Sequence, residues 1–257
     1  MIKVALCGAG KMGGEVAQAI LADSELELVA VIDQDAKKAS RFGAPAFSPE
    51  QLQEAIRNAD VCVDFTMAEA AANNVPKMAA AGKNVVVGTT GFSPEQRGTI
   101  ENAVAEAGVA GIIAPNFSVG ASVFCKIAGE MAKKLQGYDV EIIEAHHNEK
   151  KDAPSGTALK ALAAVAEAVG AGEQDFTFGR GKGKFPRRKG EIGVHAIRGG
   201  NIVGEHTILF AGNNEKIELC HSAQSRACFA AGCVRSIKWI ASRKDGKVHS
   251  MEKVLGF

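Results

Sequence analysis

A glycine-rich loop lies near the start of the chain, directly between a strand-like run and an amphipathic segment. Residues 8–13 read Gly-Ala-Gly-Lys-Met-Gly, and they follow the run Lys3–Cys7 and open a helical pattern over Lys11–Ala22. In a G-x-G-x-x-G turn, the first glycine permits a tight turn and the third lets a helix pack closely on a strand. The loop therefore predicts a strand, a tight turn and a helix in immediate succession.

The first 117 residues continue this alternation of apolar runs and helical patterns. The expected strands are Lys3–Cys7, Leu26–Ile32, Val61–Phe65, Val85–Val87 and Ala110–Ala114. The expected helices are Lys11–Ala22, Pro49–Asn58, Ala68–Ala81 and Pro94–Ala107, and Pro76 is a candidate break in the third of them. Strands that are apolar on both faces and separated by helices indicate an α/β fold, here a Rossmann-like doubly wound parallel sheet.

The pattern changes after Asn116 and predicts a second, smaller α+β domain. Helices are expected at Ser118–Leu135, Gly156–Val169 and Cys228–Ser242, and strands at Val140–Ala145, Gly193–Arg198, Ile202–Phe210 and Lys216–His221. The last three strands have no helix between them, which favours an antiparallel or mixed sheet. The Gly-, Lys- and Arg-rich stretch Gly179–Gly190 is expected to be an exposed, solvated loop.

Composition excludes several classes of protein. Hydrophobic residues make up 46% of the chain, charged residues 23%, and the net charge is +1, so no bulk charge favours nucleic acid or a membrane surface. No apolar stretch approaches the roughly 20 residues that span a bilayer. The six cysteines form no CxxC pair and predict free thiols, with no disulfide framework and no metal site. We expect a cytoplasmic protein.

An acidic residue in register with the glycine loop predicts a dinucleotide ligand. Asp33 ends the second expected strand, 20 residues beyond Gly13, where a carboxylate can bond the adenosine ribose while the helix N-terminus holds the pyrophosphate. The segments Gly88–Gly91 and Ala114–Phe117 also follow strands, at the edge where open α/β sheets bind ligands. The alternative for the glycine loop is a purely structural turn, with Asp33 as a surface acid. The alternative for the other two segments is that Gly, Thr, Pro and Asn are there only because they suit turns.

The residues after Asp33 bear on the choice of nicotinamide cofactor. Asp33 would repel the 2′-phosphate of NADPH and thus favours NADH. Lys37, Lys38 and Arg41 follow closely and could neutralise that phosphate. We expect the protein to use NADH or NADPH.

A polar segment after the strand at Val140–Ala145 carries the second set of candidate residues. Ser155 is a candidate N-cap, Gly156 has no side chain to hinder an anion, and Lys150 adds positive charge, which together suit a carboxylate beside the ionisable His146. Adjacent strand residues face opposite sides of a sheet, so His146 and His147 serve one cleft only if the strand ends near Ala145. The alternatives are a satisfied polar histidine and a solvated Lys-Lys-Asp turn. A zinc site at two adjacent histidines has little support.

The segment 141–158, Glu-Ile-Ile-Glu-Ala-His-His-Asn-Glu-Lys-Lys-Asp-Ala-Pro-Ser-Gly-Thr-Ala, resembles the signature of the dihydrodipicolinate (4-hydroxy-tetrahydrodipicolinate) reductases. The likeness extends over the whole chain, through the glycine loop, residues 88–90, 114–117 and the stretch Arg198–His206. It implies reduction of 4-hydroxy-tetrahydrodipicolinate to tetrahydrodipicolinate in lysine and diaminopimelate biosynthesis, with a small dicarboxylate as substrate. The rival functions are another reductase of the same architecture, such as an aspartate dehydrogenase, and a nucleotide-sensing protein without turnover.

The resemblance also implies roles for individual residues. It assigns proton transfer to His146 and Lys150, and substrate binding to His147, Gly156 and Thr157. It assigns cofactor binding to Gly8, Ala9, Gly10, Lys11, Met12, Gly13, Asp33, Gly88, Thr89, Thr90, Ala114, Pro115, Asn116 and Phe117. NADPH-preferring members often carry Arg after the strand-end acid, and this chain has Gln34 there, which speaks against a strong NADPH preference.

The resemblance further implies how the chain divides and assembles. A dinucleotide-binding domain would span residues 1–117, with 228–257 returning to it. Residues 118–227 would form a substrate-binding and oligomerisation domain whose sheets pack together in a homotetramer. We expect the two domains to close over the substrate.

Overall fold

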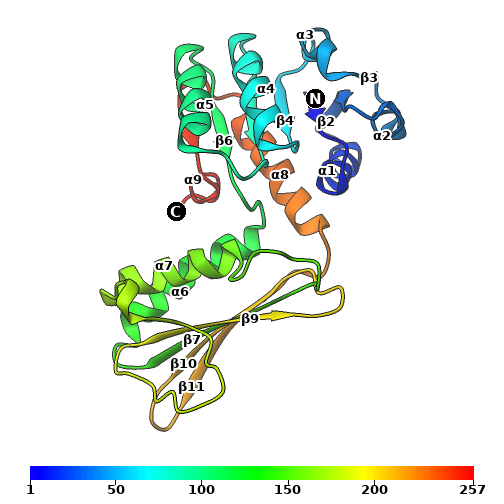
Figure 1. Cartoon of the computed structure of the whole chain (residues 1–257). Coiled ribbons are helices and arrows are strands. Elements are labelled where there is room, and N and C mark those ends of the chain that lie inside the picture. Colours follow the sequence, from blue (N-terminus) through cyan, green and yellow to red (C-terminus); the bar gives the residue numbers. More distant parts are fainter. The chain divides into compact units, whose positions relative to one another are not determined.

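The computed structural model describes residues 1–257, and the chain divides into two units (Figure 1). Unit 1 contains Met1–Val119 together with Arg226–Phe257, and unit 2 is the continuous segment Gly120–Ser225. None of the helices combines the length and apolar character that crossing a membrane requires.

Unit 1 is built on a seven-stranded parallel sheet with the order β12-β6-β5-β4-β1-β2-β3. The strands are β1 Ile2–Cys7, β2 Leu26–Ile32, β3 Ala46–Phe47, β4 Val61–Asp64, β5 Asn84–Val87, β6 Gly111–Ile113 and β12 Val248–His249. The strand order reverses between β1 and β4. In open α/β sheets this is the point at which ligands bind outside the carboxyl ends of the strands.

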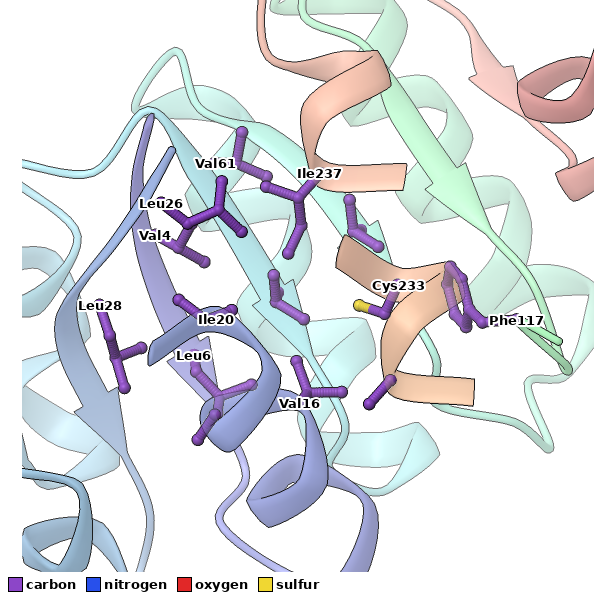
Figure 2. Packing of buried hydrophobic residues seen from close by; sticks show 14 of the residues in the cluster. Val4, Leu6, Val16, Ile20, Leu26, Leu28, Val61, Phe117, Cys233 and Ile237 are labelled. Atoms are coloured by element: carbon purple, nitrogen blue, oxygen red, sulfur yellow. The ribbon is translucent and has the colours of Figure 1, made fainter. Parts of the chain in front are cut away.

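Helices cover both faces of this sheet because its strands are apolar on both faces. Val4 and Leu6 of β1 pack with α1 and α8 (Figure 2), in a cluster that also contains residues of α9. Ala5 and Cys7 belong to a second cluster, with residues of α3, α4 and α5. The helices are α1 Lys11–Leu21, α2 Ala36–Ala39, α3 Leu52–Ala55, α4 Ala68–Ala80, α5 Pro94–Glu106, α8 Ala227–Ile240 and α9 Met251–Leu255, with 3-10 turns η1 Ser40–Phe42 and η2 Pro49–Gln51. The predicted α/β, Rossmann-like class is confirmed.

Two local predictions in unit 1 are wrong. Helix α4 continues through Pro76 without a break, although the proline has no N–H to donate to the preceding turn. Val75, Met78 and Ala79 on either side of it are buried, and their packing offsets the lost hydrogen bond. The helix expected at Pro49–Asn58 is only the turn η2 followed by α3.

The returning segment is fastened to the sheet by a buried asparagine. Asn84 of β5 is fully buried, and its Nδ2 donates to the carbonyls of Ile240 and Arg243 at 2.7 and 3.0 Å. Its Oδ1 accepts from the Ala110 N–H at 3.0 Å. The last carbonyls of a helix have no partner within the helix, and here one side chain satisfies them at the end of α8. Residues 226–257 thus complete the core of unit 1.

Unit 2 is a five-stranded mixed sheet with the order β11-β10-β7-β9-β8, and helices α6 and α7 lie on one face of it (Figure 1). Strand β10 is antiparallel to β7 and β11, whereas β9 is parallel to β7 and β8. The elements are α6 Val119–Lys134, β7 Asp139–His146, α7 Gly156–Val169, η3 Glu173–Asp175, β8 Phe176–Phe178, β9 Ile192–Arg198, β10 Glu205–Ala211 and β11 Lys216–Ser222. The predicted α+β unit with a mixed sheet is confirmed.

The basic loop before β9 is not the purely solvated excursion expected from its composition. Arg180 pairs with Glu141 of β7 at 2.8 Å and also with Glu191, and Arg187 pairs with Glu141. Lys182 and Lys184 remain exposed. The prediction is wrong for the two arginines because Glu141, which pairs with both, is distant in sequence and becomes their neighbour only through the pairing of β7 with β9.

Candidate active site

The glycine loop after β1 is too tightly folded to accept side chains at two of its positions. Gly8 has a φ of +90°, and a Cβ there would lie 2.5 Å from the Phe65 carbonyl oxygen. A Cβ on Gly13 would lie 1.8 Å from the Gly8 carbonyl oxygen. Around Gly10, the N-cap of α1, nothing lies within 4 Å of the position a Cβ would occupy. The N-terminus of α1 is therefore open to an anion, and the cradle fits a pyrophosphate.

Asp33 is held beside this loop by two backbone amides. Its Oδ2 accepts from the Ala9 N–H at 2.6 Å and its Oδ1 from the Asp35 N–H at 2.8 Å. A carboxylate has about four acceptor sites, so further sites remain for hydroxyl donors such as those of a ribose. Among the nearby basic residues, Arg41 donates to the Ala9 carbonyl at 3.2 Å, and Lys38 pairs with Asp35.

A cavity of about 440 Å³ lies at the carboxyl ends of β4 and β5. Its lining residues are Met12, Phe65, Thr66, Met67, Ala68, Glu69, Gly88, Thr89 and Thr90. Beneath it, Asp64 is buried and accepts from the hydroxyls of Thr66 and Thr89, both at 2.7 Å. Burial raises the pKa of the Asp64 carboxyl, and these hydrogen bonds oppose the rise. The structure thus brings Met12, Gly88, Thr89 and Thr90 to one cavity of unit 1.

Residues 114–117, which follow β6, contribute to the core and to a local turn in addition to the cofactor role that the resemblance implies. The Phe117 side chain is buried in the core, with its ring 5.8 Å from that of Phe65. Asn116 Oδ1 accepts from the Ser118 N–H at 2.8 Å, Ala114 is buried, and Pro115 is exposed. The cofactor role that the resemblance gives to these residues stays a prediction.

In unit 2, strand β7 runs through His146 and the chain turns away at His147. The turn is fixed by the Asn148 N–H, which donates to the Gly200 carbonyl at 3.2 Å, and by the Lys150 N–H, which donates to the His147 carbonyl at 3.1 Å. His146 is buried and His147 is half-buried. Because the strand ends between the two histidines, the alternation rule does not place them on opposite faces.

The carboxylate of Glu144, two residues before His146 on the same face of β7, holds the neighbouring groups together. Arg198 of β9 forms two parallel bonds to it, at 2.8 and 2.9 Å, and His146 Nδ1 lies 2.6 Å from its Oε2. Glu144 is fully buried, which acts to raise its pKa, but Arg198, His146 and the Ser155 N–H together hold that pKa below its ordinary value. Glu144 is therefore ionised at neutral pH.

Ser155 caps the N-terminus of α7, as the sequence predicts. Its Oγ accepts from the Ala158 N–H at 3.2 Å, and His206 Nε2 lies 3.1 Å from the same oxygen. The amides of Gly156 and Thr157 therefore sit at the positive end of the helix. A Cβ on Gly156 would meet nothing within 4 Å, which leaves room for a ligand at this end.

Lys150 places a positive charge beside these groups. Its Nζ donates to Asp152 Oδ1 at 2.8 Å, and its side chain is 21% exposed, so it remains accessible. Burial lowers the pKa of His146 and Glu144 opposes that change, while Lys150 and Arg198 add to the lowering. In the free protein His146 is therefore mostly neutral at pH 7.

Three residues that shape this site received no role from the sequence. Glu144 could have been found, since residues two apart on a strand share a face and Glu144 and His146 are such a pair. Arg198 and His206 could not, because they come from β9 and β10. The strand register places Arg198 opposite His146 and His206 opposite Glu144.

The buried His206 predicts a loss of stability in mild acid. Burial, helped by His146 and His221, lowers the pKa of His206 to about 4, against about 6.5 in an unfolded chain. Between these values the unfolded state binds more protons, so the His206 contribution is complete above pH 6.5 and is lost as pH falls towards 4, by about 3 kcal/mol in the free energy of unfolding.

Urea unfolding at pH 7 and pH 4 of the wild type and of His206→Gln measures this contribution. The variant is expected to lose less stability over that pH range than the wild type. His249→Gln, which removes a histidine of unit 1, is the control and should retain the wild-type pH dependence. Equal pH dependence in His206→Gln and the wild type would contradict the assignment.

Comparison with known proteins agrees with this geometry. Residues 2–117 match the family model described as "Dihydrodipicolinate reductase, N-terminus", and residues 120–255 match "Dihydrodipicolinate reductase, C-terminus". The chain is 46% identical to the 4-hydroxy-tetrahydrodipicolinate reductases of Methanosarcina barkeri and Methanosarcina mazei, over the full length of each. It is 30% identical to a dipicolinate-bound dihydrodipicolinate reductase from Paenisporosarcina sp. TG-14, with a TM-score of 0.79 and 97% of each chain covered.

The Rossmann-like sheet, its glycine cradle and the histidine site of unit 2 define a nicotinamide-dependent oxidoreductase. Both halves of the chain match models of one family, and the relatives align from end to end. The chain belongs to the dihydrodipicolinate reductase family, which confirms the resemblance seen in the sequence.

Proposed function

We propose that the protein reduces 4-hydroxy-tetrahydrodipicolinate to tetrahydrodipicolinate with NADH or NADPH, in the cytoplasm, as a step of lysine and diaminopimelate biosynthesis. The observation that carries the proposal is the cluster in unit 2, where the buried Glu144 carboxylate joins His146 to the N-terminus of α7 and the charge of Lys150 acts on the His146 imidazole. A sensor of nucleotides has no use for such a cluster, whereas a reductase of a dicarboxylate needs both an anion site and a proton donor.

The cofactor would be held by unit 1. The α1 N-terminus with Gly8, Gly10 and Gly13 fits the pyrophosphate, Asp33 can accept from ribose hydroxyls, and residues 88–90 line the cavity beside β5. When bound, the nicotinamide supplies a hydride. Unit 1 contributes binding and orientation.

The substrate would be held by the positive groups of unit 2. The amides of Gly156 and Thr157 suit one carboxylate, and His147 and Lys150 lie in the turn that precedes α7. The relative from Paenisporosarcina was solved with dipicolinate bound. A compound with two carboxylates thus matches the charge of the site.

His146 and Lys150 would supply the proton that the reduction requires. Addition of a hydride and a proton, with loss of the 4-hydroxyl as water, converts the substrate to tetrahydrodipicolinate. The two negative charges of a bound dicarboxylate would raise the pKa of His146, opposing the effects of burial, Lys150 and Arg198. Binding of the substrate would therefore bring the imidazole towards its protonated form.

A turnover assay distinguishes this function from its rivals. The loss of nicotinamide absorbance is followed with each cofactor, while a condensing enzyme generates the substrate from pyruvate and aspartate semialdehyde. Oxidation of the cofactor only when that substrate is formed supports the proposal. Oxidation with oxaloacetate and ammonia instead would indicate an aspartate dehydrogenase, and binding of cofactor without turnover would indicate a sensor.

Replacing Asp33 with serine is expected to change the cofactor preference. The substitution removes the carboxylate that repels a 2′-phosphate, so kcat/KM with NADH should fall about tenfold while that with NADPH is kept or increased. Steady-state kinetics with both cofactors measures the ratio. Asp35→Ser is the matched control, because Asp35 caps α2 two residues away and a serine can still cap it. An unchanged ratio in Asp33→Ser would show that Asp33 does not contact the ribose.

We also propose that the protein forms a homotetramer through unit 2. Helices α6 and α7 cover one face of its sheet (Figure 1), and on the other face Ile197 is 50% exposed. Light scattering after size-exclusion chromatography gives the mass in solution. A monomer at micromolar concentration would contradict this proposal.

A further inference from the structure

The carboxylate of Glu144 accepts from four donors and is cut off from solvent. Arg198 Nη1 and His146 Nδ1 bond its Oε2, while Arg198 Nη2 and the Ser155 N–H bond its Oε1 at 2.9 Å each. All four acceptor positions of the carboxylate are thus used, and the side chain has no exposed surface. One side chain therefore connects strand β7, strand β9 and the start of α7.

This pattern of donors decides which nitrogen of His146 carries a hydrogen. A guanidinium and a backbone amide can only donate, and an ionised carboxylate can only accept. His146 Nδ1, 2.6 Å from Oε2, must therefore be a donor to Glu144. In the neutral imidazole the lone pair is then on Nε2, and Nε2 is the nitrogen that takes up and gives back a proton.

His146 Nε2 lies beside the backbone of Gly204. A Cβ on Gly204 would lie only 3.1 Å from His146 Nε2, so any side chain at position 204 would crowd that nitrogen. The titratable and charged groups that face His146 are Glu144 on its own strand, Lys150 in the following turn, Arg198 of β9 and His206 of β10, whose ring lies edge-on at 5.2 Å. Glu144 is the one anion among these groups.

We propose that Glu144 is a positioning residue of the reaction: held by Arg198, it fixes the Nδ1–H tautomer of His146 and thereby makes Nε2 the nitrogen that transfers the proton. The inference rests on the proposed function, in which His146 is the proton donor. Through its bond from the Ser155 N–H, the same carboxylate also sets the position of the α7 N-terminus relative to the imidazole.

Glu144→Gln tests the proposal because an amide cannot replace the carboxylate at both oxygens. If the amide oxygen accepts from Arg198 and Ser155, its NH₂ group faces His146 Nδ1, which must then accept, and the hydrogen moves to Nε2. Nitrogen-15 spectra of the histidine rings, assigned with His146→Gln, are expected to show Nδ1–H in the wild type and Nε2–H in Glu144→Gln. This readout does not depend on catalytic activity.

The kinetic expectation has a definite sign. The Glu144 carboxylate favours the protonated form of His146, so its removal lowers the pKa of His146. Activity that requires protonated His146 falls as the pH rises through the pKa of His146. In Glu144→Gln this fall of kcat with rising pH should therefore begin about one pH unit lower than in the wild type. At pH 7 kcat is expected to fall at least tenfold or so, with the affinity for NADH unchanged.

Two further variants distinguish the effect of Glu144 on His146 from the effect of losing any ion pair in this sheet. Glu141→Gln is the matched control, because Glu141 lies on the opposite face of β7 and also pairs with an arginine and with the ring of His195, at 2.6 Å. It should leave the His146 tautomer and the pH profile as in the wild type. Arg198→Met removes a cation that lowers the pKa of His146, so it should move the same fall of kcat to higher pH, and it provides a test should Glu144→Gln fail to fold.

The outcomes distinguish the role of Glu144 from the proposed function of the protein. An Nε2–H tautomer in the wild type, the same tautomer in the wild type and Glu144→Gln, or equal effects of Glu144→Gln and Glu141→Gln would overturn the role of Glu144. A wild type that shows the expected tautomer but does not reduce the substrate would overturn the proposed function and leave the structural assignment standing.

Discussion

Replacement of Lys150 by alanine is expected to lower kcat by about 10²- to 10⁴-fold, the range found when a group that transfers or stabilises a proton is removed. Lys150 lies in the turn after β7, its side chain is partly exposed, and its partner Asp152 is a surface residue. The glycine cradle belongs to unit 1 and Lys150 to unit 2. The affinity for NADH should therefore stay within about twofold of the wild type.

Stopped-flow measurement of NADH binding beside steady-state rates tests this expectation. Lys151→Ala is the matched control, because Lys151 is the exposed neighbour of Lys150 and its loss changes the net charge equally. It should retain a kcat close to that of the wild type. If Lys150→Ala weakens NADH binding as much as it lowers turnover, the role assigned to Lys150 is wrong.

Replacement of Gly13 by alanine should weaken NADH binding by more than about 100-fold, or prevent unit 1 from folding. The added Cβ would lie 1.8 Å from the Gly8 carbonyl oxygen and 3.9 Å from the Phe65 Cβ, so the loop or the helix has to move. The first contact is with backbone, which cannot turn aside as a flexible side chain can. Displacement of the loop would remove the amides proposed to hold the pyrophosphate.

Gly14→Ala is the control for this substitution. It adds the same methyl group to the next residue of α1, where the nearest atom would be Phe42 Cζ at an ordinary 3.8 Å. Alanine is the better helix former by about 1 kcal/mol, so Gly14→Ala should be neutral or stabilising. Fluorescence titration with NADH and thermal unfolding measure both variants. Wild-type NADH affinity in Gly13→Ala would show that the cradle does not bind the cofactor.

The sequence was most informative where the signal is local. The glycine loop, the alternating strands of unit 1 and the N-cap Ser155 each depend on residues within a few positions of one another, and the structure contains them. Strands β3 and β12 were missed because two residues carry no periodic pattern. Strand β10 begins at Glu205 rather than Ile202, since the turn after β9 at Gly199 and Gly200 takes up the residues between.

The parts that could not be predicted depend on pairing between distant segments. Arg198 reaches Glu144 because β9 lies beside β7, and His206 reaches Ser155 because β10 lies on the other side of β7. The arginines of the basic loop find Glu141 in the same way. A periodic pattern reports which face of a strand is buried, but it does not report which strand lies next to it. The buried ion pairs are therefore visible only in the folded chain.

The asparagine that fastens α8 has a consequence for how the chain folds during synthesis. The ribosome delivers the amino end first, so β1 to β6 emerge long before the segment 226–257 that covers the Val4 and Leu6 side of their sheet. The Asn84 amide has its protein acceptors, the carbonyls of Ile240 and Arg243, only after that last segment has been made. Unit 2 is one continuous segment, so it can fold while the part of the unit 1 sheet that α8 and α9 later cover is still exposed to solvent. We expect this interval to be the period in which the growing polypeptide depends most on chaperones.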